Sequence, residues 1–314
     1  MTKKCIDSII NKTSDIKVEI IVVDNKSTDD SLQILEKIKD INLIKSDYNS
    51  GFSRGNNLAL KRAKGKYCIL LNNDTELKNN AFKILYNFME SHPNAGAVGP
   101  QLFFFSGEKQ YSYGPFRSVY HRSSWEFIPE LTKLKSYFYN TDVKSYKEKT
   151  KPKINNYKIV GRPRGCAFMV KTENIKSVGN LDERFFMYNE ETDWALRFMK
   201  EGFDNYFVGD AEIYHHWAGT SSGNNKFFNL VHTSSYYKYY KKHSGIKGEY
   251  ILRISFILGA FLNILLFLLN LKNDFNDKFY IKQFKDKVEK GFLFNDPLPD
   301  DTKAYLNKNN LNFN

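Results

Sequence analysis

The sequence predicts an α/β fold built on a mostly parallel, doubly wound sheet flanked by helices. Residues 20–23 and 67–71 are short, uniformly apolar runs, as expected of strands covered on both faces. Apolar residues recur at helical spacing over 31–38, and a further short apolar run follows at 41–44. The alternation of strand, helix and strand is typical of parallel sheets with helices on their faces.

The remaining elements are predicted from the same patterns. A short helix is expected near the amino terminus, and a helix follows the 67–71 strand with an apolar stripe of Leu77, Phe82, Leu85 and Phe88. The predicted ranges are a helix at 5–10, a helix at 76–91, and strands within 97–105, 159–171 and 208–214.

The strand at 67–71 ends in Asn72, Asn73 and Asp74. In such sheets, ligands collect where strands stop, and a carboxylate beside an amide is a hard oxygen site that suits a divalent cation. The alternative is a simple turn in which Thr75 caps a helix that begins near Glu76.

Two further polar stretches follow the same logic. The strand at 20–23 is followed by Asp24, Asn25 and Ser27, which are candidate ligands. The alternative is that these residues only form a turn that starts the next helix. A glycine-punctuated turn at 49–57 then places Arg54 near these loops.

In their order and spacing, these three stretches resemble glycosyltransferase family 2, the inverting enzymes of the GT-A fold. The "LNNDTEL" segment is similar to the metal-binding region of rhamnosyltransferase-like members, and the segment at 179–186 resembles the family's "GGFDERFF". The resemblance implies that Asp74 binds a divalent cation, Mn²⁺ or Mg²⁺, and that Asp24 contacts the nucleotide base. The other residues that it assigns to the nucleotide sugar are Asn25, Ser27, Asn49, Gly51, Arg54, Asn57, Asn72 and Asn73. Family members normally begin with a strand that this sequence lacks ahead of its first helix, so we expect one position in the sheet to be empty.

A second acidic centre lies at 190–193. Glu190 and Asp193 stand at i and i+3, on one side of a helix start, and Asp193 can pair with Arg197 one turn later. The helix dipole favours acids in a first turn in any case, which is the alternative explanation. The stretch resembles the family pattern "EDxDL", which implies that Glu191 is the catalytic base, with Glu190 and Asp193 as further candidates.

The chemistry of sugar transfer accounts for both centres. An acceptor hydroxyl needs a base within hydrogen-bond reach, and a departing diphosphate needs a cation to neutralise its charge. The base and the cation are expected on opposite sides of the sugar, so the acceptor attacks opposite the leaving diphosphate and the anomeric centre is inverted. After the last strand, His215 matches a family histidine that reaches the metal or the diphosphate; by itself, a histidine is more often structural.

Composition narrows the class of protein. The chain has 314 residues and a net charge of +12. Its lysines are spread widely rather than gathered in one arm, so an anionic membrane surface or a diphosphate substrate explains the charge as well as a nucleic acid does. Cys5, Cys68 and Cys166 lie far apart and are expected to be reduced, buried thiols. The amino terminus has no apolar signal region, so we expect the substrate-binding face to see the cytoplasm.

The chain is expected to divide into four parts. These are an amino-terminally truncated nucleotide-sugar-binding half at 1–110, an aromatic and basic insert at 111–156, an acceptor-binding half at 157–222, and a tail at 223–314 with a hydrophobic helix. Residues 254–271 are strongly apolar and predict either association with a membrane surface, as a spanning or an interfacial helix, or docking in a homodimer.

The predicted function is therefore a hexosyltransferase at the cytoplasmic face of the membrane. It would transfer a sugar, rhamnose being favoured, from a dTDP- or UDP-linked donor to a glycan or lipid-linked acceptor. The alternatives are a catalytically inactive remnant that binds nucleotide sugars, and a sugar nucleotidyltransferase, which would need a glycine-rich phosphate loop near its start. A nucleic-acid binder is the least favoured class.

Overall fold

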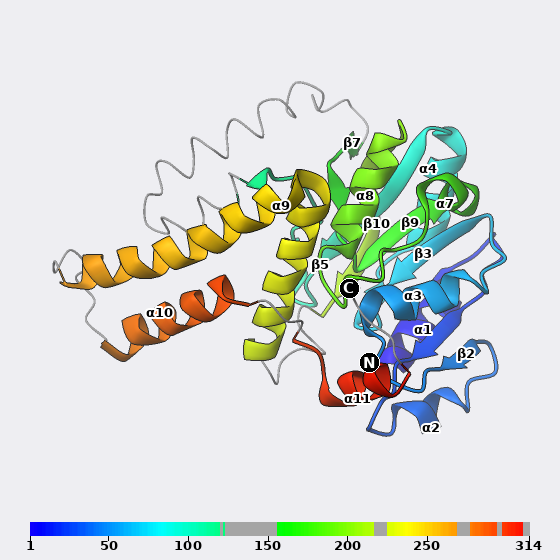
Figure 1. Ribbon diagram of the computed structural model, residues 1–314. Helices are drawn as coiled ribbons and strands as arrows, with labels where there is room; N and C mark the ends of the chain where they lie inside the picture. Colours follow the sequence, from blue (N-terminus) through cyan, green and yellow to red (C-terminus); the bar gives the residue numbers. More distant parts are fainter. Residues whose placement is uncertain (120–121, 123–155, 217–224, 269–276, 294–296, 310–314) are drawn as a thin grey trace. The chain divides into compact units, whose positions relative to one another are not determined.

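A computed structural model describes residues 1–119, 122, 156–216, 225–268, 277–293 and 297–309. Most of the predicted insert at 111–156 therefore lies outside the described residues. The chain forms two compact units: the first spans 1–116, 149–225 and 298–314, and the second spans 117–148 and 226–297. Figure 1 shows the elements of both units.

The first unit is built on a six-stranded sheet. Its strand order is β3 (Tyr67–Leu71), β9 (Ala167–Lys171), β5 (Ala95–Phe103), β10 (Asp204–His215) and β4 (Thr75–Leu77), and β7 (Tyr157–Ile159) also pairs with β10. Two small sheets accompany it: β1 (Ile21–Asp24) pairs with β2 (Asn42–Lys45), and β6 (Tyr113–Gly114) pairs with β8 (Arg162–Pro163).

The pairing corrects one detail of the predicted fold. Only β1 with β2 and β5 with β10 are parallel, whereas the other five described pairings are antiparallel, so the sheet is mixed rather than mostly parallel. The β1–β2 pair is also separate from the six-stranded sheet, in which β3 is an edge strand. Apolar runs show that strands are buried but carry no information on their relative direction.

Helices cover both faces of the six-stranded sheet (Figure 1). On one face, α1 (Thr2–Lys12) and α4 (Ala81–Ser91) pack through Cys5, Leu85 and their neighbours. On the other face, α7 (Thr172–Val178) and α8 (Glu190–Lys200) pack around the fully buried Trp194. The first unit also contains α2 (Ser31–Leu35), α3 (Gly51–Leu60) and α11 (Asp300–Lys308).

The segment after Asp74 differs from the prediction. Residues 75–77 form β4 instead of the first turn of a helix, and α4 begins only at Ala81. The register of β4 pairs Thr75 with His215, and the Asn79 side chain then accepts a hydrogen bond from the Glu212 amide at 3.1 Å. Pairing with β10 thus overrides the local helical pattern, a tertiary effect that the sequence does not reveal.

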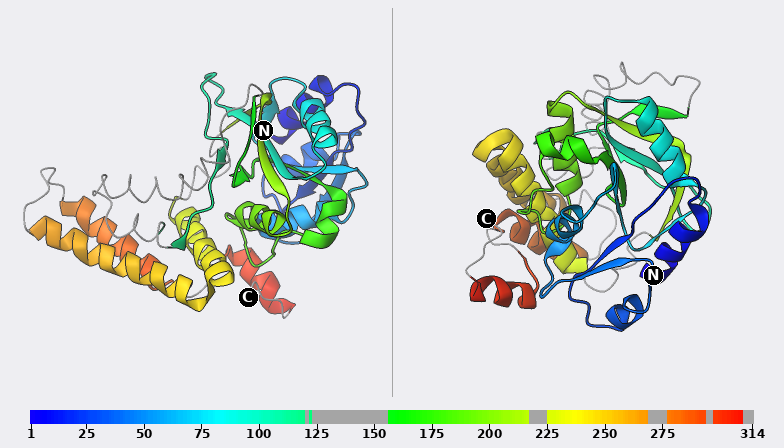
Figure 2. Two further views of the ribbon diagram at one scale, coloured as in Figure 1. Left: turned by 90° about the horizontal axis from the view of Figure 1, so that it is seen from above. Right: turned by 90° about the vertical axis from the view of Figure 1, so that its right-hand side faces the viewer.

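The second unit contains α9 (Asn225–Leu268) and α10 (Asp277–Gly291). A break at Gly245, with φ of +70°, divides α9 into two helical segments. The left view of Figure 2 shows α10 alongside the second segment, and the centroids of the Phe261 and Phe284 rings lie 6.1 Å apart there. Of the predicted hydrophobic helix at 254–271, residues 254–268 are helical and the others lie outside the described residues. None of the helices in the described ranges is both long and apolar enough to cross a membrane.

Candidate active site

Asn25 organises the loop that opens α3. Its Oδ1 accepts hydrogen bonds from the Ser50 amide at 2.9 Å and the Ser50 hydroxyl at 2.7 Å. Its Nδ2 donates to the Gly51 carbonyl at 3.0 Å and to Asn49 Oδ1 at 3.2 Å. The predicted ligands Asn25, Asn49 and Gly51 are thus brought together, with Asn25 shaping the loop. We call residues 48–51 the donor loop.

Gly51 is required for its backbone conformation. Its φ is +74°, and a Cβ at this position would lie 2.4 Å from the main-chain oxygen of Phe186. The next amide, that of Phe52, donates to the same oxygen at 2.6 Å. The donor loop is therefore fastened to the segment that leads into α8, and only glycine fits.

Asp24 forms a local turn through one carboxylate oxygen and leaves the other without a partner among the described residues. Its Oδ2 accepts a hydrogen bond from the Ser27 amide at 3.3 Å, as in a local turn. The residue is 5% exposed, and its Oδ1 is buried without a hydrogen-bond partner among the described residues. A buried acceptor of this kind is costly unless it meets a donor, so Oδ1 suits an N–H group of a bound base.

Arg54 and Asn57 lie on α3 and face the segment at 181–183. The Asn57 amide donates to the Leu181 carbonyl and to Glu183 Oε1, both at 2.9 Å, and its Oδ1 accepts from the Leu181 amide. Arg54 pairs with Glu183 at 3.3 Å. Asn57 is buried, and both its amide nitrogen and its amide oxygen are engaged in these hydrogen bonds. It therefore joins α3 to the segment at 181–183 rather than facing a ligand.

The donor loop has a support that the sequence did not suggest. The Thr302 hydroxyl on α11 donates to the Asn49 carbonyl at 2.7 Å, and Thr302 is 0% exposed. The Tyr305 ring stacks on Tyr48, with centroids 3.9 Å apart. The predicted polar tail thus contributes a helix that packs on the candidate nucleotide-binding loop.

Asp74 and His215 lie together, as the metal prediction requires. The Gln110 amide nitrogen donates to the carbonyls of His215 at 2.6 Å and Phe103 at 3.3 Å, so its Oε1 is the atom that faces His215 Nδ1, at 3.0 Å. Oε1 can only accept a hydrogen bond, which places the imidazole proton on Nδ1. Burial also lowers the pKa of His215, although the nearby Asp74 carboxylate opposes this shift.

This tautomer leaves an electron pair on His215 Nε2, which faces Asp74 Oδ1 at 3.5 Å. Asp74 is 7% exposed, and its Oδ1 is buried without a hydrogen-bond partner among the described residues. Two buried lone pairs that face each other fit a cation between them. Within the described ranges, no three or more His, Cys, Asp and Glu side chains are grouped to hold a metal ion. Asp74 and His215 would therefore supply two ligands, and any others would come from elsewhere.

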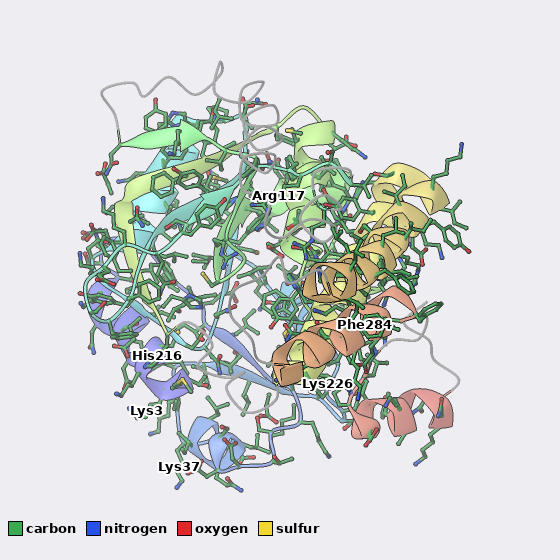
Figure 3. The ribbon with its side chains drawn as sticks, turned by 90° about the vertical axis from the view of Figure 1, so that its left-hand side faces the viewer. Lys3, Lys37, Arg117, His216, Lys226 and Phe284 are labelled. Carbon is green, nitrogen blue, oxygen red and sulfur yellow. The ribbon has the colours of Figure 1, made fainter. Side chains whose placement is uncertain are left out.

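Asn72 and Asn73 differ in orientation. The Asn72 amide donates to the Cys166 carbonyl at 2.9 Å, which fixes the end of β3 against β9. The Asn73 side chain is exposed and donates to the Thr2 hydroxyl at 3.1 Å, so it points toward α1. His216, labelled in Figure 3, follows His215 and donates its amide to the Asp74 carbonyl at 2.8 Å.

The three candidate acids of α8 have different environments. Asp193 is 0% exposed and pairs with Arg197 at 2.9 Å, as its spacing predicted. Glu191 pairs with Arg162 at 2.9 Å. Glu190 is 5% exposed, and its Oε2 has no hydrogen-bond partner among the described residues. Burial, together with the neighbouring Glu191 charge, raises the pKa of Glu190 well above its ordinary value.

Cys166 connects the two acidic centres. Burial raises the pKa of its thiol to about 12, with Arg164 opposing, and the charges of Asp74 and Glu191 both add to the increase. The pairing of Leu71 with Ala167 places the ends of β3 and β9 next to each other. A Cβ on Gly165 would lie 3.0 Å from Glu191 Cγ, so this glycine makes room for the carboxylate. Both centres therefore lie around one short segment.

Three residues of this neighbourhood were missed by sequence reasoning. Gln110 orients His215, Arg162 holds Glu191, and Arg164 lies near enough to His215 to lower its pKa. The repeated arginines of Arg162-Pro163-Arg164 ahead of a glycine were the available signal. Gln110 had none, because it reaches His215 across 105 positions of sequence.

Comparison with known proteins identifies relatives of this chain. The model of "Glycosyl transferase family 2" matches residues 1–165, just over half of the 314-residue chain. The N-acetylglucosaminyl-diphospho-decaprenol L-rhamnosyltransferase of Mycobacterium tuberculosis is 25% identical over 246 residues, which cover 73% of this chain and 76% of the relative. The low-salt glycan biosynthesis hexosyltransferase of Haloferax volcanii is 26% identical over 204 residues, which cover 62% of this chain and 57% of the relative.

Two solved structures share the fold. One is GalNAc-T7 with UDP, GalNAc and Mn²⁺, at a TM-score of 0.51 and 15% identity, matched over 76% of this chain and 47% of the other. Another is a mannosyltransferase of Pyrobaculum calidifontis with GDP-Man and Mn²⁺, at a TM-score of 0.51 and 12% identity, matched over 93% of this chain and 83% of the other. At these identities the likeness shows the GT-A fold alone. The chain therefore belongs to glycosyl transferase family 2 and is a glycosyltransferase of the hexosyltransferase type.

Proposed function

We propose that the protein is an inverting, cation-dependent glycosyltransferase that transfers a sugar from a nucleoside diphosphate to an acceptor hydroxyl. The observation that carries the proposal is geometric. The Asn72 amide, two residues before Asp74, donates to the Cys166 carbonyl at 2.9 Å, and a Cβ on the adjacent Gly165 would lie 3.0 Å from Glu191 Cγ. A cation-binding carboxylate and a candidate base thus act on one small region of the protein.

On the donor side, Asp24 and the donor loop receive the nucleotide. The buried Oδ1 of Asp24 accepts a hydrogen bond from the base, and Asn25 keeps residues 49–51 in place. Asp74 and His215, whose Oδ1 and Nε2 atoms lie 3.5 Å apart, would hold the divalent cation, Mn²⁺ or Mg²⁺. When bound, this cation neutralises the charge that develops on the leaving diphosphate.

On the acceptor side, we assign the base to Glu191. Its carboxylate is oriented by Arg162 and has room next to Gly165. The raised pKa of Glu190 favours its neutral form, which cannot take a proton, and Glu190 is nearly inaccessible. Proton removal at one face of the sugar and departure of the diphosphate at the other produce inversion of the anomeric carbon.

The relatives guide the choice of substrates. The Mycobacterium tuberculosis relative is named as a rhamnosyltransferase acting on a decaprenol-linked sugar. We therefore favour rhamnose as the donor sugar, carried by dTDP or UDP, and a lipid-linked or polysaccharide hydroxyl as the acceptor. A lipid-linked acceptor also favours a position at the cytoplasmic face of the membrane.

The decisive experiment compares donors and variants. Binding of dTDP-rhamnose, UDP-glucose, UDP-GlcNAc and GDP-mannose is measured with and without Mn²⁺, and nucleotide release is then followed for the wild type, Asp74→Asn, Glu190→Gln and Glu191→Gln. The proposal expects Mn²⁺-dependent binding of one donor, weakened in Asp74→Asn, and loss of turnover in Glu191→Gln. Binding with no turnover in the wild type would instead indicate a non-catalytic remnant, and loss of turnover in Glu190→Gln alone would move the base to Glu190. Proton NMR of the transferred sugar reports the anomeric configuration, and a retained configuration would contradict inversion.

A further inference from the structure

The second segment of α9 carries an exposed apolar stripe. The stripe consists of Ile246, Tyr250, Ile254, Leu258, Phe261 and Leu265, whose exposed fractions range from 47% to 60%. Their spacing of three or four residues puts them on one face of a helix. Over residues 246–265 the stripe is about 28 Å long at 1.5 Å per residue. Among the described side chains, every other helix has at most one exposed large hydrophobic residue.

Packing within the unit leaves most of this stripe exposed. The opposite face of the same segment carries Leu252, Phe256 and Ala260, which are between 0% and 1% exposed. Phe256 meets the Tyr237 ring at 6.2 Å, and Ile257 lies against Gly291 at the end of α10. The inner face thus supplies the core contacts, and the stripe remains as a continuous apolar surface of the kind that marks an interaction site.

The charge around the stripe selects its partner. Residues 226–297 contain twelve Lys and Arg and six Asp and Glu, a net charge of +6. Lys247 is exposed within the stripe's own segment, and α10 carries exposed Lys282 and Lys285 on either side of Phe284, which touches the stripe at Phe261. Figure 3 labels Phe284 on α10. A second copy of this unit would bring like charges together, whereas an anionic surface would be attracted.

We propose that the stripe is a membrane-docking surface and that its partner is the interface of a bilayer containing anionic lipids. The helix lies in the plane of the interface with residues 246–265 among the acyl chains, and the surrounding lysines face the headgroups. The inference deepens the proposed function and rests on it, since it explains how an enzyme for a lipid-linked acceptor would reach the membrane; docking itself is argued from the exposed side chains and the charge around them.

The test measures vesicle binding in the absence of donor and acceptor, so it is independent of activity. The full chain is sedimented with phosphatidylcholine vesicles with or without phosphatidylglycerol. The stripe variant Ile254→Glu with Leu258→Glu is compared with a control, Ile10→Glu with Met199→Glu, which places the same charges at exposed apolar positions of α1 and α8. We expect the lipid concentration for half-binding to rise about tenfold or more in the stripe variant and to change less than about twofold in the control. We also expect wild-type binding to need phosphatidylglycerol and to weaken with salt.

Several outcomes would overturn the proposal. These are absence of wild-type binding to phosphatidylglycerol vesicles, equal binding of the stripe and control variants, or a lipid-free dimer that the stripe variant dissociates, which would assign the surface to a second copy. If the stripe variant fails to fold, Leu258→Trp keeps the face apolar. Its additional fluorescence, relative to the wild type, should then shift to the blue when vesicles are added, and an unchanged spectrum would count against docking.

Discussion

Arg162 on β8 holds Glu191 on α8 through an ion pair of 2.9 Å, in which the two side chains are 19% and 13% exposed. The pair orients the carboxylate that we assign as the base. Glu191→Gln should lower kcat by about 10²–10⁴, the usual contribution of a general base, with little change in donor affinity.

Arg162→Lys should cause a smaller loss, because lysine keeps the charge but not the fork geometry of the guanidinium. Arg184→Lys is the matched control, since Arg184 pairs with Asp182 at the surface. Steady-state kinetics separate kcat from KM. Equal kcat losses in the Arg162 and Arg184 variants would show that Arg162 has no special part in orienting Glu191.

The raised pKa of Glu190 predicts a dependence of stability on pH. Burial and the nearby charges of Glu191 and Asp193 disfavour the ionised form, and Arg162 partly opposes them. Because the folded pKa lies above the unfolded one, the associated stability is fully present below about pH 4 and is lost as the pH rises toward the folded pKa.

Glu190→Gln imitates the neutral acid and should therefore raise Tm at pH 8 but not at pH 4. A rise of about 2–4 °C would correspond to about 1 kcal/mol in a chain of this size. Thermal unfolding at both pH values tests this. Glu191→Gln is the control and should not raise Tm at pH 8, because it removes an ion pair. A Tm for Glu190→Gln equal to that of the wild type at both pH values would contradict the prediction.

Gln110 should control cation affinity without touching the cation. Gln110→Leu removes the acceptor that keeps the His215 proton on Nδ1, so Nε2 is no longer held as the electron-pair donor toward Asp74. We expect Mn²⁺ affinity to fall about 10- to 100-fold, as when partners behind metal ligands are removed.

Calorimetric titration of Mn²⁺ in the presence of the nucleotide measures this affinity. Gln101→Leu is the matched control, since it removes a buried amide whose side-chain contacts are with Leu102, Gln110 and Ser112 rather than with His215. An equal loss of affinity in both variants would mean that general packing, and not the tautomer, is responsible.

Gly51→Ala should be strongly destabilising and should weaken nucleotide binding. The added Cβ would lie 2.4 Å from the fixed main-chain oxygen of Phe186, so the donor loop would have to move. We expect a loss of at least about 2–3 kcal/mol in the free energy of unfolding. Gly107→Ala is the control: its φ is +91°, but a Cβ there would have no neighbour within 4 Å. Denaturant unfolding should show that Gly107→Ala lowers the free energy of unfolding by only about 1–2 kcal/mol. Equal losses in the two variants would rule out the clash with Phe186 as the cause.

Tyr305, near the carboxyl end of the sequence, stacks on Tyr48 of the donor loop, so Tyr305→Ala should make this loop less rigid. The stacked pair with Tyr48 contributes about 0.5–1.5 kcal/mol beyond its buried area, and its loss leaves the loop held at Asn49 by Thr302. We expect several-fold weaker nucleotide binding, which Tyr305→Phe should restore because it keeps the ring. Titration with UDP and dTDP in Mn²⁺ provides the measurement. If the alanine variant binds as tightly as the wild type, α11 has no part in shaping the nucleotide site.

The sequence alone located the two apolar strands that lead to the candidate site and the polar residues that follow them. Apolar runs located β1 and β3, and the structure shows that the carboxylates that follow these runs, Asp24 and Asp74, are buried. The spacing of Asp193 and Arg197 likewise gave the correct ion pair, because both residues lie on one helix. Local periodicity is sufficient for such features, since neighbours along one element are fixed by its geometry.

Only the tertiary structure decided the partners across elements. The antiparallel register of β4 on β10 replaced a predicted helical turn, and the contact of Gln110 with His215 selected the tautomer at the cation site. The pairing of Arg162 with Glu191 distinguished one glutamate from its neighbour, and α11 reached the donor loop from the end of the chain. These contacts join residues whose separation in sequence carries no periodic signal, so they exist only once the sheet and its helices have packed.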